Sequence, residues 1–224
     1  MVRLQIVPQS AASRAKACVA IERNKGLKVM ATEEMNLDRI GLLEQLFPRP
    51  DEVLFVSGLA GAARDAAALT GDGDNLFTMA GTMGAAVSMG LGVALAAPER
   101  QVAVITGDGE LMMNVGALAT VANQAPENLS IVCLDNSRHG ETGGQLGLTA
   151  GLTNLAVMAA GAGIANVATL NDPGDIAEAA AFLNEGVGPR FLCCRVMPGP
   201  PSSYKRDMDL ARCRLRFRDA YLGG

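Results

Sequence analysis

Histidine, tryptophan and paired cysteines are scarce in this chain. Its 224 residues include one histidine, His139, and no tryptophan, and its five cysteines form no Cys-x-x-Cys pair. A mechanism that needs two histidines is therefore excluded, and a zinc site is not expected. Three of the cysteines, at positions 133, 193 and 194, lie within apolar runs, so we expect them to be small buried residues.

Long apolar runs and clusters of positive charge are also missing. No apolar run reaches the roughly 20 residues that a membrane-spanning helix needs. Pro8 and Ser10 interrupt the N-terminal stretch, which has no continuous apolar segment of the signal-peptide type. The net charge is -4, and the basic stretch "RCRLRFRDAY" is broken by apolar residues, as is typical of a solvated helix face. We therefore expect a cytoplasmic protein with no membrane and no nucleic-acid partner.

What the chain does contain is a regular alternation of short apolar runs and Ala- and Gly-rich helical stretches. The predicted strands are 52–58, 75–81, 101–107, 128–136, 165–170 and 189–199. The predicted helices are 59–71, 82–100, 111–125, 153–163 and 172–186. Strands that alternate with helices predict an α/β fold in which a parallel sheet is sandwiched by helices.

The two ends of the chain fall outside this alternation. Residues 1–35 are predicted to be an N-terminal extension, either a helical arm or a subunit contact. The amphipathic stretch 36–47 is a candidate first helix, because Pro48 stops it. No internal repeat or linker divides the rest, so we predict one domain over 36–200 and a helical tail over 201–224.

Polar residues mark the ends of two predicted strands. Asp108 lies between Gly107 and Gly109, and Asn136 follows 28 residues later, after the next apolar run. Carboxylate and amide oxygens are ligands for Mg²⁺, which is often shared with phosphate oxygens. "GDGE" or "DNSRHG" alone would be an ordinary turn, but the order strand, GDG, helix, strand, DN favours a diphosphate anchor at the carboxyl edge of the sheet.

The sequence around these motifs resembles the thiamine diphosphate enzymes, whose magnesium motif is GDG followed by NN. The resemblance covers roughly residues 52–198 and is carried by "FTMAGTMGAAVSMG", "VITGDGELMMN", "GALATVANQAP" and "TGGQ". It narrows to the phosphonopyruvate and sulfopyruvate decarboxylases. It implies the diphosphate-binding domain of the thiamine diphosphate-binding fold.

The resemblance also implies a set of site residues. Asp108, the side chain of Asn136 and the carbonyl of Arg138 would bind Mg²⁺, and Asp135 stands where the family has its first Asn. Gly109 and Glu110 would present backbone N–H groups to the diphosphate. The cofactor-binding residues implied are Ser57, Gly58, Gly81, Thr82, Met83, Gly107, Asp108, Gly109, Glu110, Asn136, His139, Gly140 and Thr142.

Some of these positions depart from the family's motif or allow a second interpretation. Ser57 and Gly58 match the start of the family's "STTG" loop, but Leu59 and Ala60 depart from it, so fewer hydroxyl contacts are expected. Met83 matches the apolar residue that holds the cofactor bent, although a lone methionine is more often a core residue. His139 is the candidate catalytic residue, as a substrate contact or proton shuttle. The alternative for His139 is an exposed turn residue.

The family's activating glutamate lies on a separate pyrimidine-binding domain, which residues 1–50 are too short to hold. The resemblance therefore implies a β-type subunit whose α-type partner brings that glutamate, in an oligomer that decarboxylates a small 2-oxo acid. An acetolactate synthase-like carboligase subunit and a non-catalytic regulatory subunit that keeps the fold remain alternatives. A nucleotide-binding domain is a fourth, but "SGLAGAAR" matches GxGxxG only in part.

The sequence says less about which 2-oxo acid is the substrate than about the cofactor. Leu148 and Leu152 stand where relatives that act on sulfonate or phosphonate acids have His or Lys. A cation for an anionic substrate tail is therefore absent from this loop. Either the partner supplies that cation, or the substrate is a less charged 2-oxo acid.

Overall fold

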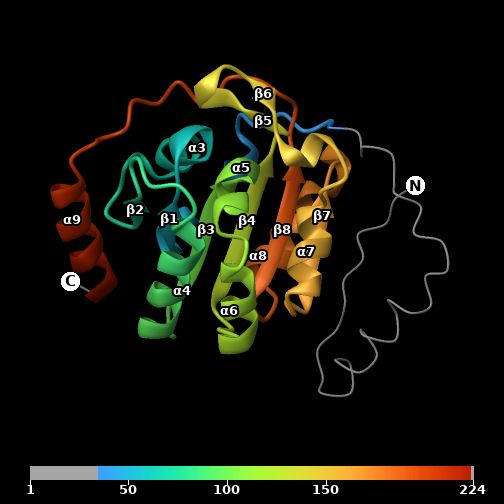
Figure 1. Ribbon diagram of the computed structural model, residues 1–224. Helices are drawn as coiled ribbons and strands as arrows, with labels where there is room; N and C mark the ends of the chain where they lie inside the picture. The colour runs from blue at the N-terminus through green and yellow to red at the C-terminus, as the bar shows by residue number, and fades with distance from the viewer. Residues whose placement is uncertain (1–34, 223–224) are drawn as a thin grey trace.

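A six-stranded parallel sheet forms the centre of the computed structural model, which describes residues 35–222 (Figure 1). The strand order is β2-β1-β3-β4-β8-β7. The strands are β1 (Val53–Ser57), β2 (Leu76–Thr78), β3 (Gln101–Gly107), β4 (Leu129–Asp135), β7 (Asn166–Leu170) and β8 (Arg190–Arg195). The predicted α/β fold with a parallel sheet is confirmed. The predicted extension 1–35 lies outside the described residues apart from its last residue.

Helices cover both faces of the sheet, as parallel strands buried on both sides require. One face carries α2 (Leu42–Leu46), α3 (Ala60–Thr70) and α8 (Ile176–Asn184). The other carries α4 (Ala86–Ala96), α6 (Ala117–Gln124) and α7 (Leu155–Gly161) (Figure 1). Each face of the sheet has its own hydrophobic core, and successive side chains of β1 point to opposite faces. Phe55 packs into the core beneath α2, α3 and α8, whereas Leu54 and Val56 pack into the core beneath α4, α6 and α7.

Several helices are shorter than their sequence patterns. The stretch 36–47 is helical only in α2, and the stretch 82–100 only in α4. Gly84 has a φ of 81°, a conformation that ends regular structure before α4. The predicted helix 111–125 is two helices, α5 (Asp108–Met113) and α6, separated at Asn114. The Asn114 side chain donates to the carbonyl of Gly84 at 3.1 Å and so ties the end of α5 to the loop before α4.

Close packing of α4 on the sheet occurs along one side of the helix. A Cβ built on Gly90 would lie 2.1 Å from Val104 Cγ2, so only glycine fits there. Gly92 faces open space. Gly90 therefore allows α4 to approach β3 closely.

The tail crosses the carboxyl edge of the sheet before it becomes helical. Residues 198–209 form a strap that is held where Ser202 N donates to Asp65 Oδ1 at 2.8 Å and Asp207 N to Asp72 Oδ2 at 2.6 Å. Helix α9 (Leu210–Leu222) then packs beside β2 (Figure 1). No helix within residues 35–222 is both long and apolar enough to cross a membrane.

Candidate cofactor and metal site

The parallel sheet brings the two polar motifs together at its carboxyl edge. Strands β1, β3 and β4 are consecutive in the sheet and parallel, so their carboxyl ends meet. Gly107 at the end of β3 pairs with Leu134 in β4. Asp108, which begins α5, therefore lies beside Asp135. The sequence prediction that the two strand ends share one edge is thus met by the register of the strands.

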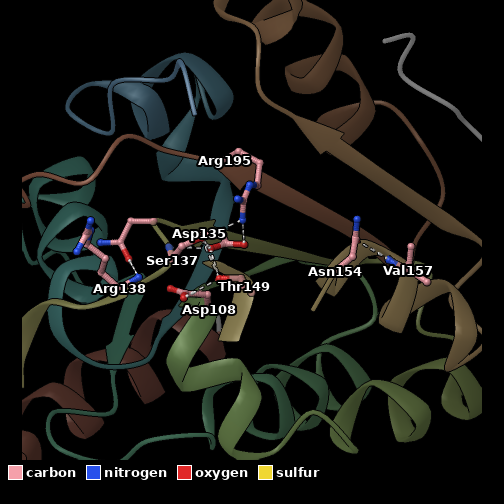
Figure 2. A network of polar contacts seen from close by, with 9 residues as sticks. Asp108, Asp135, Ser137, Arg138, Thr149, Asn154, Val157 and Arg195 are labelled. Carbon is pink, nitrogen blue, oxygen red and sulfur yellow. Dashed lines mark hydrogen bonds and ion pairs between the residues drawn. The ribbon is translucent and has the colours of Figure 1, made fainter. Parts of the chain in front are cut away.

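A threonine hydroxyl connects these carboxylates (Figure 2). Thr149 Oγ1 lies 3.1 Å from Asp108 Oδ2, 2.7 Å from Asp135 Oδ1 and 3.1 Å from Ser137 Oγ, and all of these residues are buried. The hydroxyl carries one proton and can donate to one carboxylate at a time. Asp108 and Asp135 therefore compete for the same donor.

An ion pair compensates one of the two carboxylates. Arg195, at the end of β8, pairs through Nη1 with Asp135 Oδ2, and the same nitrogen lies 3.2 Å from Ser137 Oγ. Arg195 is 6% exposed and Asp135 1% exposed, so the pair is shielded from water. Among residues 35–222, no Lys or Arg forms an ion pair with Asp108. The negative charge of Asp108 is therefore not balanced by a basic side chain of these residues.

That surplus charge affects the titration of Asp108. Burial, and secondly the charge of Asp135, raise the pKa of Asp108 to about 6 from its ordinary 3.8, despite the opposing hydrogen bond from Thr149. A buried carboxylate without a cation favours either a proton or a metal ion. This property makes Asp108 a suitable magnesium ligand.

Asp108→Asn is expected to stabilise the metal-free chain above about pH 6. The folded chain holds the Asp108 proton more tightly than the unfolded chain, so this contribution is present below the ordinary pKa of 3.8 and is lost as pH rises through about 6. The deficit at neutral pH is roughly 2–3 kcal/mol at most. Urea unfolding with a chelator at about pH 5 and about pH 7.5 should show a smaller pH dependence for the variant. Equal pH dependence in both proteins would contradict the burial of this charge.

The other donors around Asp108 also fit a hard cation. Within residues 35–222, no three His, Cys, Asp or Glu side chains gather into a metal site, so a metal here would need amide and carbonyl oxygens as well. Asn136 is half-buried, and its Oδ1 accepts the N–H of Arg138 at 3.0 Å. This turn leads directly into the short hairpin of β5 (Arg138–His139) and β6 (Gln145–Leu146). Oxygen donors of these types suit magnesium.

The hairpin places His139 against the GDG motif. A Cβ built on Gly109 would lie 2.9 Å from His139 Cε1 and Nδ1, so the imidazole packs on the glycine. His139 is nevertheless exposed, as are Gly140 and Thr142 in the 3-10 turn that follows. The candidate catalytic residue and the candidate diphosphate anchor are therefore neighbours.

The remaining predicted residues lie in two different environments. Gly81, Thr82 and Met83 form the exposed loop before α4. Met83 is 41% exposed and belongs to neither core, which disfavours the alternative that it is a packing residue. Ser57 is fully buried, so its hydroxyl is not open to solvent, and among the described residues that hydroxyl has no hydrogen-bond partner.

Sequence reasoning missed Thr149, Ser137 and Arg195. Arg195 offered a signal, because a charged residue that closes the apolar run "FLCC" needs a buried partner. Thr149 offered none, since its contact with Asp108 depends on how the chain folds back after the hairpin. Glu110 was expected to contribute its backbone N–H, but its side chain is also buried against Gly58.

Comparison with known proteins identifies the family of this chain. The family model described as "Thiamine pyrophosphate enzyme, C-terminal TPP binding domain" matches residues 68–194. The chain belongs to this family. Thiamine pyrophosphate is thiamine diphosphate, so the family resemblance expected from GDG and its surroundings is confirmed.

Relatives within the thiamine pyrophosphate enzyme family include decarboxylases. The chain is 36% identical over 183 residues to "Sulfopyruvate decarboxylase subunit beta" of Methanothermobacter thermautotrophicus, which covers 82% of this chain and 95% of that subunit. It is 38% identical over 162 residues to "Phosphonopyruvate decarboxylase" of Streptomyces viridochromogenes, and the aligned region covers 72% of this chain. The chain spans only 40% of the length of that second relative.

A solved structure shares the fold. The 2-oxoglutarate:ferredoxin oxidoreductase from Magnetococcus marinus superposes with a TM-score of 0.56 at 18% identity, over 78% of this chain and 65% of that one. At this identity the likeness concerns the fold alone. It agrees with the parallel sheet and helical layers described above.

Proposed function

We propose that this chain is the β-type subunit of a Mg²⁺- and thiamine diphosphate-dependent decarboxylase that releases CO₂ from a small 2-oxo acid and leaves an aldehyde. The observation that carries the proposal is the uncompensated Asp108 at the carboxyl edge, beside the Asn136 turn, in a chain of the thiamine pyrophosphate enzyme family. The similarity to subunits named sulfopyruvate decarboxylase and to phosphonopyruvate decarboxylases supports the reaction type.

The residues of this chain would anchor and orient the cofactor. Asp108, the Asn136 amide oxygen and the Arg138 carbonyl would hold Mg²⁺. The N–H groups of Gly109 and Glu110 would bind the diphosphate. Thiamine diphosphate, when bound, supplies the carbanion and the electron sink for decarboxylation.

Contacts to the reacting part of the cofactor and to the substrate would come from two exposed loops. Met83, in the loop before α4, would support the bent shape of the cofactor. His139 packs on Gly109 and is open to solvent, so its imidazole is placed to contact the substrate or move a proton. Correct positioning of reacting groups lowers a barrier by roughly 7–11 kcal/mol at best.

A partner of the α type would complete the site. Leu146, Leu148 and Leu152 follow His139 along the chain and are 67%, 62% and 84% exposed. Exposed apolar side chains next to a candidate site are typical of a surface that another chain covers. The partner would bring the pyrimidine-binding domain with the activating glutamate, in a cytoplasmic hetero-oligomer.

The purified chain alone is expected to release no CO₂ from 2-oxo acids, because the proposed α-type partner would supply the activating glutamate. Mixed with an α-type chain, thiamine diphosphate and Mg²⁺, it should become active. A CO₂-release assay on each chain and on the mixture measures this, and product analysis separates an aldehyde from the 2-hydroxy ketone of a carboligase. Rapid decarboxylation by the isolated chain would refute the split site, and an inactive mixture that still binds the cofactor would favour the regulatory alternative.

A further inference from the structure

A side chain 52 residues further along the sequence occupies the space in which a Cβ at position 58 would lie. A Cβ built on Gly58 would lie 1.7 Å from Glu110 Oε2 and 1.9 Å from Glu110 Oε1. The Glu110 carboxylate therefore lies directly against the backbone that follows β1. Glu110 is 4% exposed, so its carboxylate fills space beneath the site and does not reach open solvent.

The same carboxylate connects segments from different strands. Glu110 Oε2 accepts the N–H of Leu59 at 3.1 Å and the hydroxyl of Thr106 at 3.0 Å. Within residues 35–222, the Oε1 atom of Glu110 has no hydrogen-bond partner. Glu110 thus contacts the loop after β1 and the end of β3.

These are the segments to which the proposed function assigns the cofactor. The loop after β1 contains Gly58, and the end of β3 leads into Asp108. The Gly58 N–H donates to the Ile105 carbonyl in β3 at 3.2 Å, and Glu110 extends this connection to the next residue, Leu59. A single buried acceptor shared among them restricts how they move relative to one another.

We propose that the Glu110 side chain is a positioning residue that braces the loop after β1 against the end of β3 and so presets the cradle for the diphosphate. The inference rests on the proposed function for its consequence, but the brace itself exists in the cofactor-free chain. Glu110 acts through Leu59 and Gly58 and touches no reacting atom. The rival interpretation is that the carboxylate competes with the diphosphate for the Leu59 N–H.

The first test measures the brace without any cofactor. Amide hydrogen exchange of Leu59, followed by NMR on the full chain, should accelerate about tenfold or more in Glu110→Ala, because the acceptor is lost. Glu110→Gln keeps an amide oxygen at the same reach and should retain most of the protection. Glu110→Ser, which is too short to reach Leu59, replaces the alanine variant if that variant does not fold. Unchanged Leu59 exchange in the short variants would overturn the proposal.

The second test measures the consequence for the cofactor. In the complex with the α-type chain at saturating Mg²⁺, Gly58→Ala should weaken thiamine diphosphate binding about tenfold, because its methyl group displaces Glu110. In a Glu110→Ala background the same change should cost little, and Glu110→Gln alone should bind nearly as well as wild type. Additive losses from the two substitutions, or tighter binding by Glu110→Ala, would overturn the proposal. If the wild-type complex binds no thiamine diphosphate, the proposed function fails, while the exchange experiment still decides on the brace.

Discussion

Asp108→Ala is expected to abolish thiamine diphosphate and Mg²⁺ binding to the assembled enzyme, and Asp108→Asn to weaken it by more than about 100-fold. Loss of a residue that only supports a metal ligand costs about 10–100-fold in affinity, and loss of the charged ligand itself should cost more. No cation compensates Asp108 within residues 35–222, so its charge is available to the metal.

Calorimetry with Mg²⁺ and thiamine diphosphate measures this effect. Glu178→Gln removes an exposed carboxylate from α8, on the layer that packs against the sheet away from α4, and serves as the control with unchanged affinity. Far-UV circular dichroism should confirm that Asp108→Asn folds, as its greater stability without metal predicts. Wild-type affinity in the asparagine variant would refute the assignment of Asp108 to the metal.

Arg195→Met is expected to destabilise the chain by about 3–5 kcal/mol, because it leaves the Asp135 carboxylate buried without a partner. Arg195 is the cation paired with Asp135, and its Nη1 also contacts Ser137. The hydrogen bonds from Ser137 and Thr149 would remain but do not neutralise the charge.

Urea unfolding measures the loss, and a second substitution tests its cause. Asp135→Asn combined with Arg195→Met removes both charges and keeps an oxygen for Thr149, so the double variant should recover most of the lost stability. Arg49→Met breaks a solvent-exposed pair with Glu52 and should change stability by less than about 1 kcal/mol. A single variant at Arg195 as mild as this control would contradict the importance of the buried pair.

Much of this architecture could be predicted from local sequence patterns. The strands follow from continuous apolar runs such as "QVAVIT", and the parallel sheet follows from their alternation with helices. The shared edge of Asp108 and Asn136 then follows from topology alone. These features depend on residues close in sequence and on general rules of chain connection.

The contacts that tune the site could not be predicted in this way. Thr149 meets Asp108 across 41 residues, Arg195 meets Asp135 across 60, and Glu110 meets Leu59 across 51. Such pairs depend on loop paths and side-chain rotamers that no periodicity reports. The end of α5 was missed for a related reason, because Asn114 at that end bonds to the carbonyl of Gly84, 30 residues away in the sequence.

Helix α9 has a consequence for self-association of the folded chain. A short outermost strand with free peptide groups is a template on which a second molecule can add its own strand. Here Phe217 stacks edge-on against Phe77 with ring centroids 5.6 Å apart, and Cys213 Sγ lies 3.6 Å from the Leu76 carbonyl. Helix α9 thus covers the β2 edge of the sheet and protects it against aggregation by strand addition. The opposite edge of the sheet is β7.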